Sequence, residues 1–315
     1  MHNREPLATA ADKRQKNGQT ALLIAALGGI VAIVSLFLTK HIGWWGVLGG
    51  FGIVVVAIIL AAIMVDPYEK RFYKAYYNEY LYPELSSVTD DAKIELPNGF
   101  TKKELRDMKI ISSLRKHVSR CELVCTIRGK SVRSSHLLYE KSRTVGKKSK
   151  LSKEAVPSMQ AQIITLTDLD VTAPDMIIRP RGIYATEGVR FKNKRPEMLL
   201  VGAGTEALEA RYEVLSKEID ATADFLTDDF CDKLLQLRNI VRFMSPNSGI
   251  FIDLRGNTCH IMISNWDNGC MPTMKSTMSS AYFEKCAVYT TALLDSCVRL
   301  FEPDKEFTFK PEVEL

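Results

Sequence analysis

Two long apolar runs near the N-terminus constrain this chain more than any other feature. They cover residues 20–38 and 44–65, and a short link at residues 39–43 joins them. Neither run contains Lys, Arg, Asp, Glu or His. A helix needs about 20 apolar residues to cross the hydrocarbon core of a bilayer. We therefore predict a transmembrane helical hairpin over residues 20–65.

Basic residues near the ends of the runs predict the direction of the hairpin. Residues 1–19 contain Arg4, Lys13, Arg14 and Lys16, the segment after the second run contains Lys70, Arg71 and Lys74, and the link contains Lys40. Lys and Arg favour the cytoplasmic side of a membrane. We therefore predict a cell-membrane protein with two spans and with both termini in the cytoplasm. The first run is too long for a signal peptide, so we expect it to be retained.

Glycine and proline predict details of the hairpin. The spans contain Gly28, Gly29, Gly46, Gly49, Gly50 and Gly52. Such small residues let membrane helices approach closely. Pro67 cannot donate a main-chain hydrogen bond, so Asp66-Pro67 is expected to end or bend the second helix.

The rest of the chain divides by composition. We predict a cytoplasmic N-terminal tail at 1–19, the hairpin at 20–65, an amphipathic juxtamembrane helix and linker at 66–90, a cytoplasmic α+β domain at 91–302, and a polar tail at 303–315. Aromatic residues of the juxtamembrane helix recur at helical spacing: Phe72, Tyr73, Tyr76, Tyr77 and Tyr80. This aromatic face either lies in the membrane interface or packs on the soluble domain.

Local patterns within residues 91–302 predict an α+β fold of antiparallel β-hairpins and helices. Thr101 and Glu104 have the spacing of a capping box. Alternating segments flank Gly129 and Gly256, which is typical of β-hairpins. Further short strands are expected at 160–166, 176–178, 183–186 and 198–201, and longer helices at 227–244 and 280–301.

A basic run follows the first predicted β-hairpin. It consists of Lys141, Arg143, Lys147, Lys148, Lys150 and Lys153. The first interpretation is a solvated loop, and the sharper one is contact with anionic lipid headgroups, because the chain is already tethered to that surface. Nucleic acid is not an expected partner, since no aromatic residues are interleaved for stacking and the net charge is only +5.

Candidate chemical groups do not form a recognisable catalytic pattern. The chain has seven cysteines, an odd number that favours reduced thiols over a disulfide framework. Cys121 and Cys125 lack the second ligand pair of a zinc site. His136, near Ser134-Ser135 and Cys121, could serve a nucleophile, but the sequence gives no geometry. We therefore predict no catalytic residue, no metal and no cofactor.

One short glycine motif also invites a functional interpretation. Gly202, Gly204 and Ala207 fit a dinucleotide-loop variant. The preceding strand is short, and no alternation of strands and helices builds a Rossmann unit around it. We therefore interpret the segment as an ordinary loop.

The order of these elements resembles a bacterial family of two-span membrane proteins with a C-terminal cytoplasmic domain of unknown function. The segment from Glu209 through Tyr212 to Val214, followed by Leu226-Thr227, carries the resemblance, together with Gly99-Phe100 and residues 121–138. The likeness covers residues 20–302 and places residues 141–153 at a variable lysine-rich loop. It implies location and architecture, and it implies no reaction.

Three function classes follow from these observations. The favoured one is a membrane-anchored interaction or scaffold protein with an unidentified protein partner, because no catalytic pattern is visible. The alternative is a lipid-binding or envelope-associated protein that uses residues 141–153 on the membrane surface. A hydrolase-type enzyme ranks below both.

Overall fold

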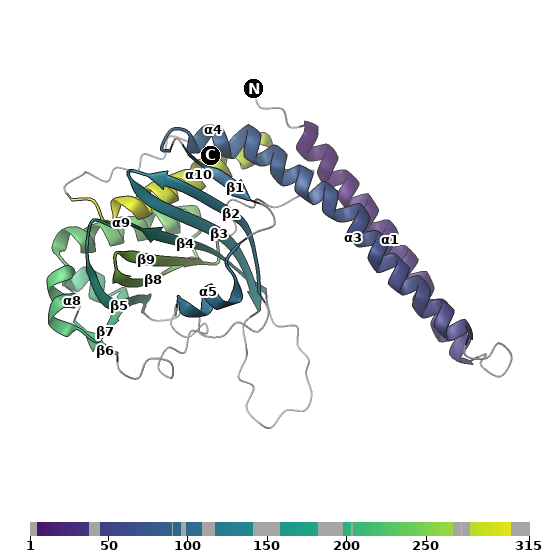
Figure 1. The fold of residues 1–315 in the computed structure, drawn as a ribbon, viewed down its shortest axis with the longest axis horizontal. Helices are drawn as coiled ribbons and strands as arrows, with labels where there is room; N and C mark the ends of the chain where they lie inside the picture. The colour runs from purple at the N-terminus through teal and green to yellow at the C-terminus, as the bar shows by residue number, and fades with distance from the viewer. Residues whose placement is uncertain are drawn as a thin grey trace. The chain divides into compact units, whose positions relative to one another are not determined.

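The computed structural model describes residues 5–37, 45–89, 91–95, 99–108, 117–140, 158–181, 198–202, 204–266, 272 and 278–303. The chain forms two compact units (Figure 1). The first comprises Met1–Tyr80 and Thr273–Phe283, and the second comprises Leu81–Pro272 and Glu284–Leu315.

Two long helices, α1 (Glu5–Phe37) and α3 (Trp45–Tyr76), pack side by side in the first unit (Figure 1). Leu7–Val34 of α1 is long and apolar enough to cross a membrane. It is the one such segment found among the residues whose side chains the structure describes. α1 begins well before the apolar run. Residues 5–19, expected as a tail, therefore extend the first helix beyond its apolar part.

Apart from Leu7, small side chains line the buried face of α1. Its buried residues recur at steps of three and four or their sums, as in Leu7, Ala11, Ala21, Gly28 and Ala32. This spacing keeps one stripe of a helix against its neighbour. Gly28 is buried, as the predicted close approach through glycine requires. Gly49 and Gly52 are exposed, and a Cβ added at either position would meet nothing within 4 Å, so these two glycines do not contribute to a close approach.

The second helix does not end at Pro67, so the first of the two predicted effects of this proline, an end or a bend, is wrong. α3 is assigned as one helix of 32 residues that passes through this position. Tertiary packing along α1 offsets the hydrogen bond that proline cannot donate. The helical path changes ten residues later, at the π-helix η1 (Tyr77–Leu81), which α4 (Tyr82–Leu85) follows. Pro83 lies in the first turn of α4, where the main-chain hydrogen bond that proline cannot donate is not needed.

The strands that the structure describes in the second unit form one antiparallel sheet with the order β1-β2-β3-β4-β9-β8-β5-β7-β6. Their bounds are β1 (Lys93–Glu95), β2 (His117–Ile127), β3 (Lys130–Glu140), β4 (Ser158–Thr167), β5 (Ala173–Pro180), β6 (Leu199–Val201), β7 (Tyr212–Ser216), β8 (Gly249–Gly256) and β9 (Thr258–Ser264). The predicted mixture of helices and antiparallel strands is confirmed. The expected strand at 183–186 lies outside the described residues.

Both predicted β-hairpins are present. β2 and β3 are joined by Arg128 and Gly129, which both have positive φ, of 52° and 77°. Two positive φ angles mark the type I′ turn, whose twist matches that of the flanking strands. β8 and β9 are joined around Gly256, with a φ of 57°. Each strand pair is therefore set by its own turn.

Helices cover both faces of the sheet (Figure 1). The short helix α5 (Lys102–Asp107) lies on one face, above a core that includes Leu105, Leu137, Ile163 and Phe251. The longer helices, α8 (Ile219–Phe225), α9 (Asp228–Met244) and α10 (Ser280–Arg299), lie on the other face, while α7 (Glu206–Glu209) adjoins α9 and β7. We call the first of these the α5 face.

Candidate functional site

Large apolar side chains are exposed along both helices of the first unit. In the described part of the chain, fourteen of the twenty exposed large apolar residues lie on α1 or α3, including Leu22 at 73% and Trp45 at 81% exposure. Patches of this extent are rare on soluble proteins because they leave apolar area in water. The surface from Leu22 to Val34 and from Trp45 to Ile59 is therefore suited to contact lipid.

The aromatic face of the juxtamembrane segment is buried inside the first unit. The side chains of Phe72, Tyr76 and Tyr80 are at most 1% exposed. Their rings surround Phe283, with centroid distances of 5.8 Å, 6.1 Å and 5.7 Å. Such offset and edge contacts stabilise packed rings. Of the two interpretations of this face, packing against the protein is therefore the one that the contacts favour.

A row of polar residues crosses the sheet on the α5 face. Arg133 on β3 pairs in register with Thr165 on β4, Thr165 pairs with His260 on β9, and His260 pairs with Asp253 on β8. Direct cross-strand neighbours lie close enough for their side chains to interact. Strand register thus gathers four residues from distant parts of the sequence. We call them the polar row.

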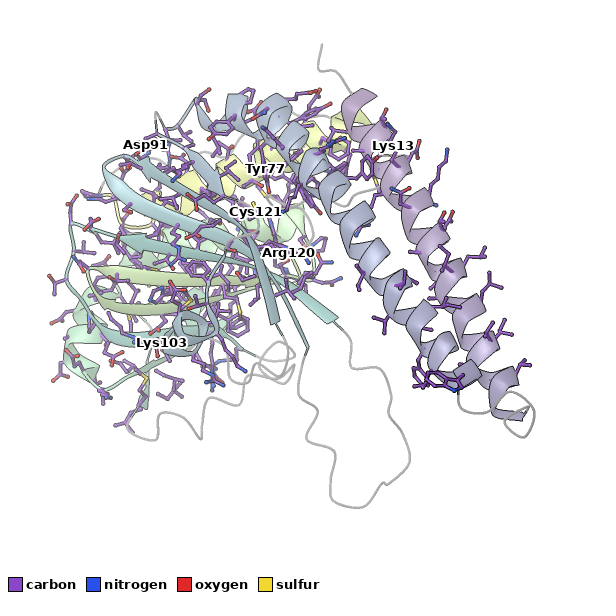
Figure 2. The ribbon with its side chains drawn as sticks, turned by 45° about the vertical axis from the view of Figure 1, so that its right-hand side comes forward. Lys13, Tyr77, Asp91, Lys103, Arg120 and Cys121 are labelled. Atoms are coloured by element: carbon purple, nitrogen blue, oxygen red, sulfur yellow. The ribbon has the colours of Figure 1, made fainter. Side chains whose placement is uncertain are left out.

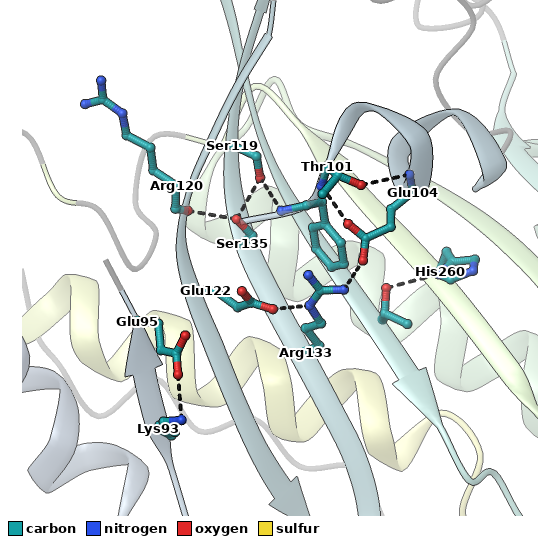
Figure 3. Close-up of polar contacts among 12 residues, drawn as sticks. Lys93, Glu95, Thr101, Glu104, Ser119, Arg120, Glu122, Arg133, Ser135 and His260 are labelled. Carbon is teal, nitrogen blue, oxygen red and sulfur yellow. Dashed lines mark hydrogen bonds and ion pairs between the residues drawn. The ribbon is translucent and has the colours of Figure 1, made fainter. Parts of the chain in front are cut away.

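Arg133 fastens the start of α5 to one end of the polar row (Figure 3). Its guanidinium donates to the carboxylates of Glu104 and Glu122 and lies 4.3 Å from the ring centroid of Phe100. The predicted capping box is confirmed, since Thr101 and Glu104 bond reciprocally. Burial raises the pKa of Glu104, but the bonds from Arg133 and Thr101 outweigh it and lower that pKa to about 2.

Arg255 fastens the end of α5 at the opposite end of the row. Its Nη2 donates to the main-chain oxygen of Asp107 over 2.8 Å. Its guanidinium also binds both carboxylate oxygens of Asp253, which is fully buried. A buried carboxylate without such a partner would be costly. Arg255 therefore balances the charge of Asp253 and also holds the end of α5.

His260 is the titratable base of the row. Its Nδ1 lies 3.0 Å from Oγ1 of Thr165 (Figure 3). Burial and, secondarily, the charge of Arg255 lower the pKa of His260 to about 4. The imidazole is therefore neutral at pH 7, and its bond to Thr165 fixes the ring position. The structure places His260 on the α5 face of the sheet.

A β-bulge adjoins the start of α5 (Figure 3). The register of β2 against β3 shifts between Arg120 and Leu123, and Cys121 there has a φ of 59°. The main-chain nitrogen of Phe100 donates to Ser119 over 2.9 Å, and the Ser119 and Ser135 hydroxyls are also 2.9 Å apart. Ser135 in turn donates to the Arg120 oxygen over 2.8 Å.

The bulge leaves no space for a side chain at the neighbouring Gly99. A Cβ there would lie 2.6 Å from the main-chain carbon of Ser119. Bulges and non-glycine residues with positive φ concentrate near functional sites. We therefore take the bulge and the polar row together as the candidate site of the second unit.

The suspected nucleophile group around His136 is divided between the two faces of β3, with Ser134 and His136 on one face and Ser135 on the other. Ser134 and Ser135 are consecutive on β3, so they point to opposite faces of the sheet. Ser135 bonds within the bulge, whereas Ser134 accepts a bond from Gln162 over 2.6 Å. Burial lowers the pKa of His136 to about 4, and a general base works best with a pKa near the operating pH. With that pKa, His136 is a poor general base for a neighbouring serine at pH 7.

The six cysteines in the described residues are buried thiols, whereas Cys270 lies outside that part. Burial raises the pKa of Cys125 to about 12 and also raises the pKa values of Cys259 and Cys297. Thiolate is the reactive form, so these thiols are inert at pH 7. No group of three or more metal-binding side chains occurs in the described ranges.

The glycine motif after β6 is a packing feature. A Cβ at Gly204 would lie 2.2 Å from the main-chain oxygen of Leu226. The helix that follows, α7, has four residues, and β6 pairs antiparallel with β7. A dinucleotide loop requires a parallel strand–helix–strand unit, so the interpretation as an ordinary loop agrees with this arrangement.

The basic run proposed for lipid contact lies outside the described residues. This applies to all six of its members, Lys141, Arg143, Lys147, Lys148, Lys150 and Lys153.

The polar row had no signal in the sequence, because its members meet only through strand register. Comparison of the chain with protein-family models, curated proteins and solved structures gave no match.

Proposed function

We propose that this chain is a membrane-anchored interaction or scaffold protein. In this proposal α1 and α3 cross the cell membrane as a two-span hairpin, both termini are cytoplasmic, and the α+β unit binds a protein partner. The proposal includes membership of the bacterial two-span family that the sequence resembles. The bilayer is the first partner, and the second is a protein not yet identified.

The exposed apolar surface of the first unit carries the proposal. Both helices present large side chains outward, from Leu22 to Val34 and from Trp45 to Ile59, while the small residues of α1 face α3. A water-soluble helical hairpin would bury its large apolar residues and expose polar ones. The inverse pattern fits a hairpin surrounded by lipid.

The polar contacts of the second unit favour binding over catalysis. The charged groups of the α5 face are engaged in holding α5: Arg133 with Glu104, and Arg255 with Asp253. An active site instead directs polar groups toward a common substrate position. We therefore propose that the α5 face is a rigid scaffold, and that the anchored unit acts through its surface.

The test is fractionation followed by purification of the full chain in mild detergent. The proposal predicts that the chain stays in membranes after alkaline carbonate washing and that it co-purifies with one protein at fixed stoichiometry. A different two-span membrane protein, expressed to the same level, controls for carry-over. Release by carbonate would contradict the anchor, and purification without any protein partner would contradict the scaffold role.

A further inference from the structure

Exposed basic side chains lie just beyond the apolar surface on both helices of the first unit. They are Lys13, Lys16, Lys70, Arg71 and Lys74, and we call them the basic collar. Over residues 12–16 and 66–74 the sequence has six basic residues, including Arg14, against three acidic ones. Charge of one sign is therefore concentrated where the two helices leave their apolar parts.

One aromatic ring places the two halves of the collar at the same level. Lys13 Nζ on α1 lies 6.0 Å from the ring centroid of Tyr68 on α3, and the Arg71 guanidinium carbon lies 5.5 Å from it. Cations within about 6 Å of an aromatic face are attracted to it. Tyr68 thus holds one cation from each helix. Figure 2 shows Lys13 on the polar part of α1.

The distance along the helices matches the depth of lipid phosphates. Lys13 precedes the apolar run by seven residues, or about 10 Å of helix, and Arg71 follows the second run by six residues, or about 9 Å. The headgroup layer adds roughly 5–7 Å on each side of the hydrocarbon core. Long basic side chains can bend back across the small remaining distance.

We propose that the basic collar is a binding site for anionic phospholipid headgroups. This inference rests on the proposed membrane anchor. The collar is continuous with the apolar surface that begins at Leu22, so a ligand with an anionic head and apolar tails contacts both parts. An acidic protein would match the cations but would have to displace lipid from the adjoining apolar side chains. Because the surface combines basic and apolar side chains, we identify lipid as its occupant.

The helical extension of α1 fixes the position of the collar cations. Residues 5–19 are outside the apolar run, yet their helix carries Lys13 and Lys16 alongside α3. A flexible tail would spread these charges over many positions. The helix holds them at one depth, which favours a defined headgroup site over diffuse attraction.

The test uses the full chain in detergent micelles that contain equal amounts of phosphatidylglycerol and phosphatidylcholine. Bound lipids are identified by mass spectrometry after purification. We expect phosphatidylglycerol to be enriched on the wild-type chain, and each collar cation that is neutralised should reduce the enrichment about fivefold at low salt. The test variants are Lys13→Gln, Arg71→Gln and their combination.

Two control variants distinguish the loss of a collar cation from a general loss of positive charge and from disturbed folding. The pair Lys102→Gln and Lys103→Gln removes two exposed charges from α5 and should leave the enrichment unchanged. Arg71→Lys keeps the charge and should retain most of the enrichment. Enrichment that is absent from the wild-type chain, or that survives in the double collar variant, would overturn the inference.

A separate readout distinguishes failure of this site from failure of the anchor. Each variant is also reconstituted into vesicles of the same two lipids and floated on a density gradient. A chain that floats without selecting phosphatidylglycerol retains its anchor and refutes the collar site. A wild-type chain that does not float refutes both the proposed anchor and the inference built on it.

Discussion

The carboxylate of Glu104, in the first turn of α5, is joined to the guanidinium of Arg133 on β3. At the other end of α5, Arg255 donates to the main-chain oxygen of Asp107. α5 has six residues, too few for a helix that is stable by itself. The sheet therefore holds this helix at both ends, through arginines that also balance the carboxylates beneath it.

Replacement of Glu104 by Gln should destabilise the protein in a pH-dependent way. The pKa of Glu104 is about 2, below its ordinary value of 4.5, so its contribution is present above pH 4.5 and is lost as the pH falls toward 2. Because the side chain is partly exposed, we expect a loss of only about 1 kcal/mol at pH 7. Thermal unfolding in detergent should show the gap to wild type closing below pH 4.5, while Glu206→Gln on α7 should show no such gap.

Acidification should destabilise the wild-type protein through His260. Its folded pKa of about 4 is below the unfolded value near 6.5, so the contribution is complete above pH 6.5 and is lost as the pH falls through 4. The full pKa difference corresponds to at most about 3 kcal/mol. His260→Asn should show a shallower decline of melting temperature from pH 6.5 to 4, although His136 adds a component common to both proteins. Equal slopes would refute the assigned burial of His260.

Gly204→Ala should destabilise the second unit, because the new Cβ would lie 2.2 Å from the main-chain oxygen of Leu226. We expect a loss of about 1–3 kcal/mol, the usual range for overpacking. Gly202→Ala is the matched control. Its Cβ would meet only the flexible carboxylate of Glu209, at 3.2 Å. Similar unfolding midpoints for the two variants would contradict the packing described here.

The small-residue face of α1 can be tested with two identical changes at different positions. Ala21 is 7% exposed and faces α3, whereas Ala26 is exposed. Ala21→Leu should lower the melting temperature in detergent, because a larger side chain forces the helices apart, and Ala26→Leu should not. If Ala26→Leu is the more harmful change, the described packing face of α1 is wrong.

Local signals in the sequence predicted most of the helices and turns. Thr101 accepts a bond from the main chain of α5, as its capping-box spacing predicted, and Thr227 caps α9 at the predicted start of that helix. The positive φ of Gly129 and Gly256 likewise follows from the turns that join adjacent strands. These features depend on residues only a few positions apart, so a single sequence contains the necessary information.

Features that depend on distant residues could not be predicted in this way. His260 meets Thr165 because β9 lies beside β4 in one particular register. The path of α3 through Pro67 likewise depends on packing with α1, since local preference alone favours an end or a bend there. The polar row and the unbroken helix therefore emerge only with the tertiary structure.

The most direct test of the membrane anchor is the location of both chain ends in one experiment. Reporters active only in the cytoplasm or only outside the membrane are fused, in separate full-length chains, before Met1 and after Leu315. The proposed two-span hairpin predicts cytoplasmic activity at both ends and membrane retention of both fusions. Opposite locations for the two ends would contradict the two-span hairpin, and recovery of the fusions in the soluble fraction would contradict the anchor itself.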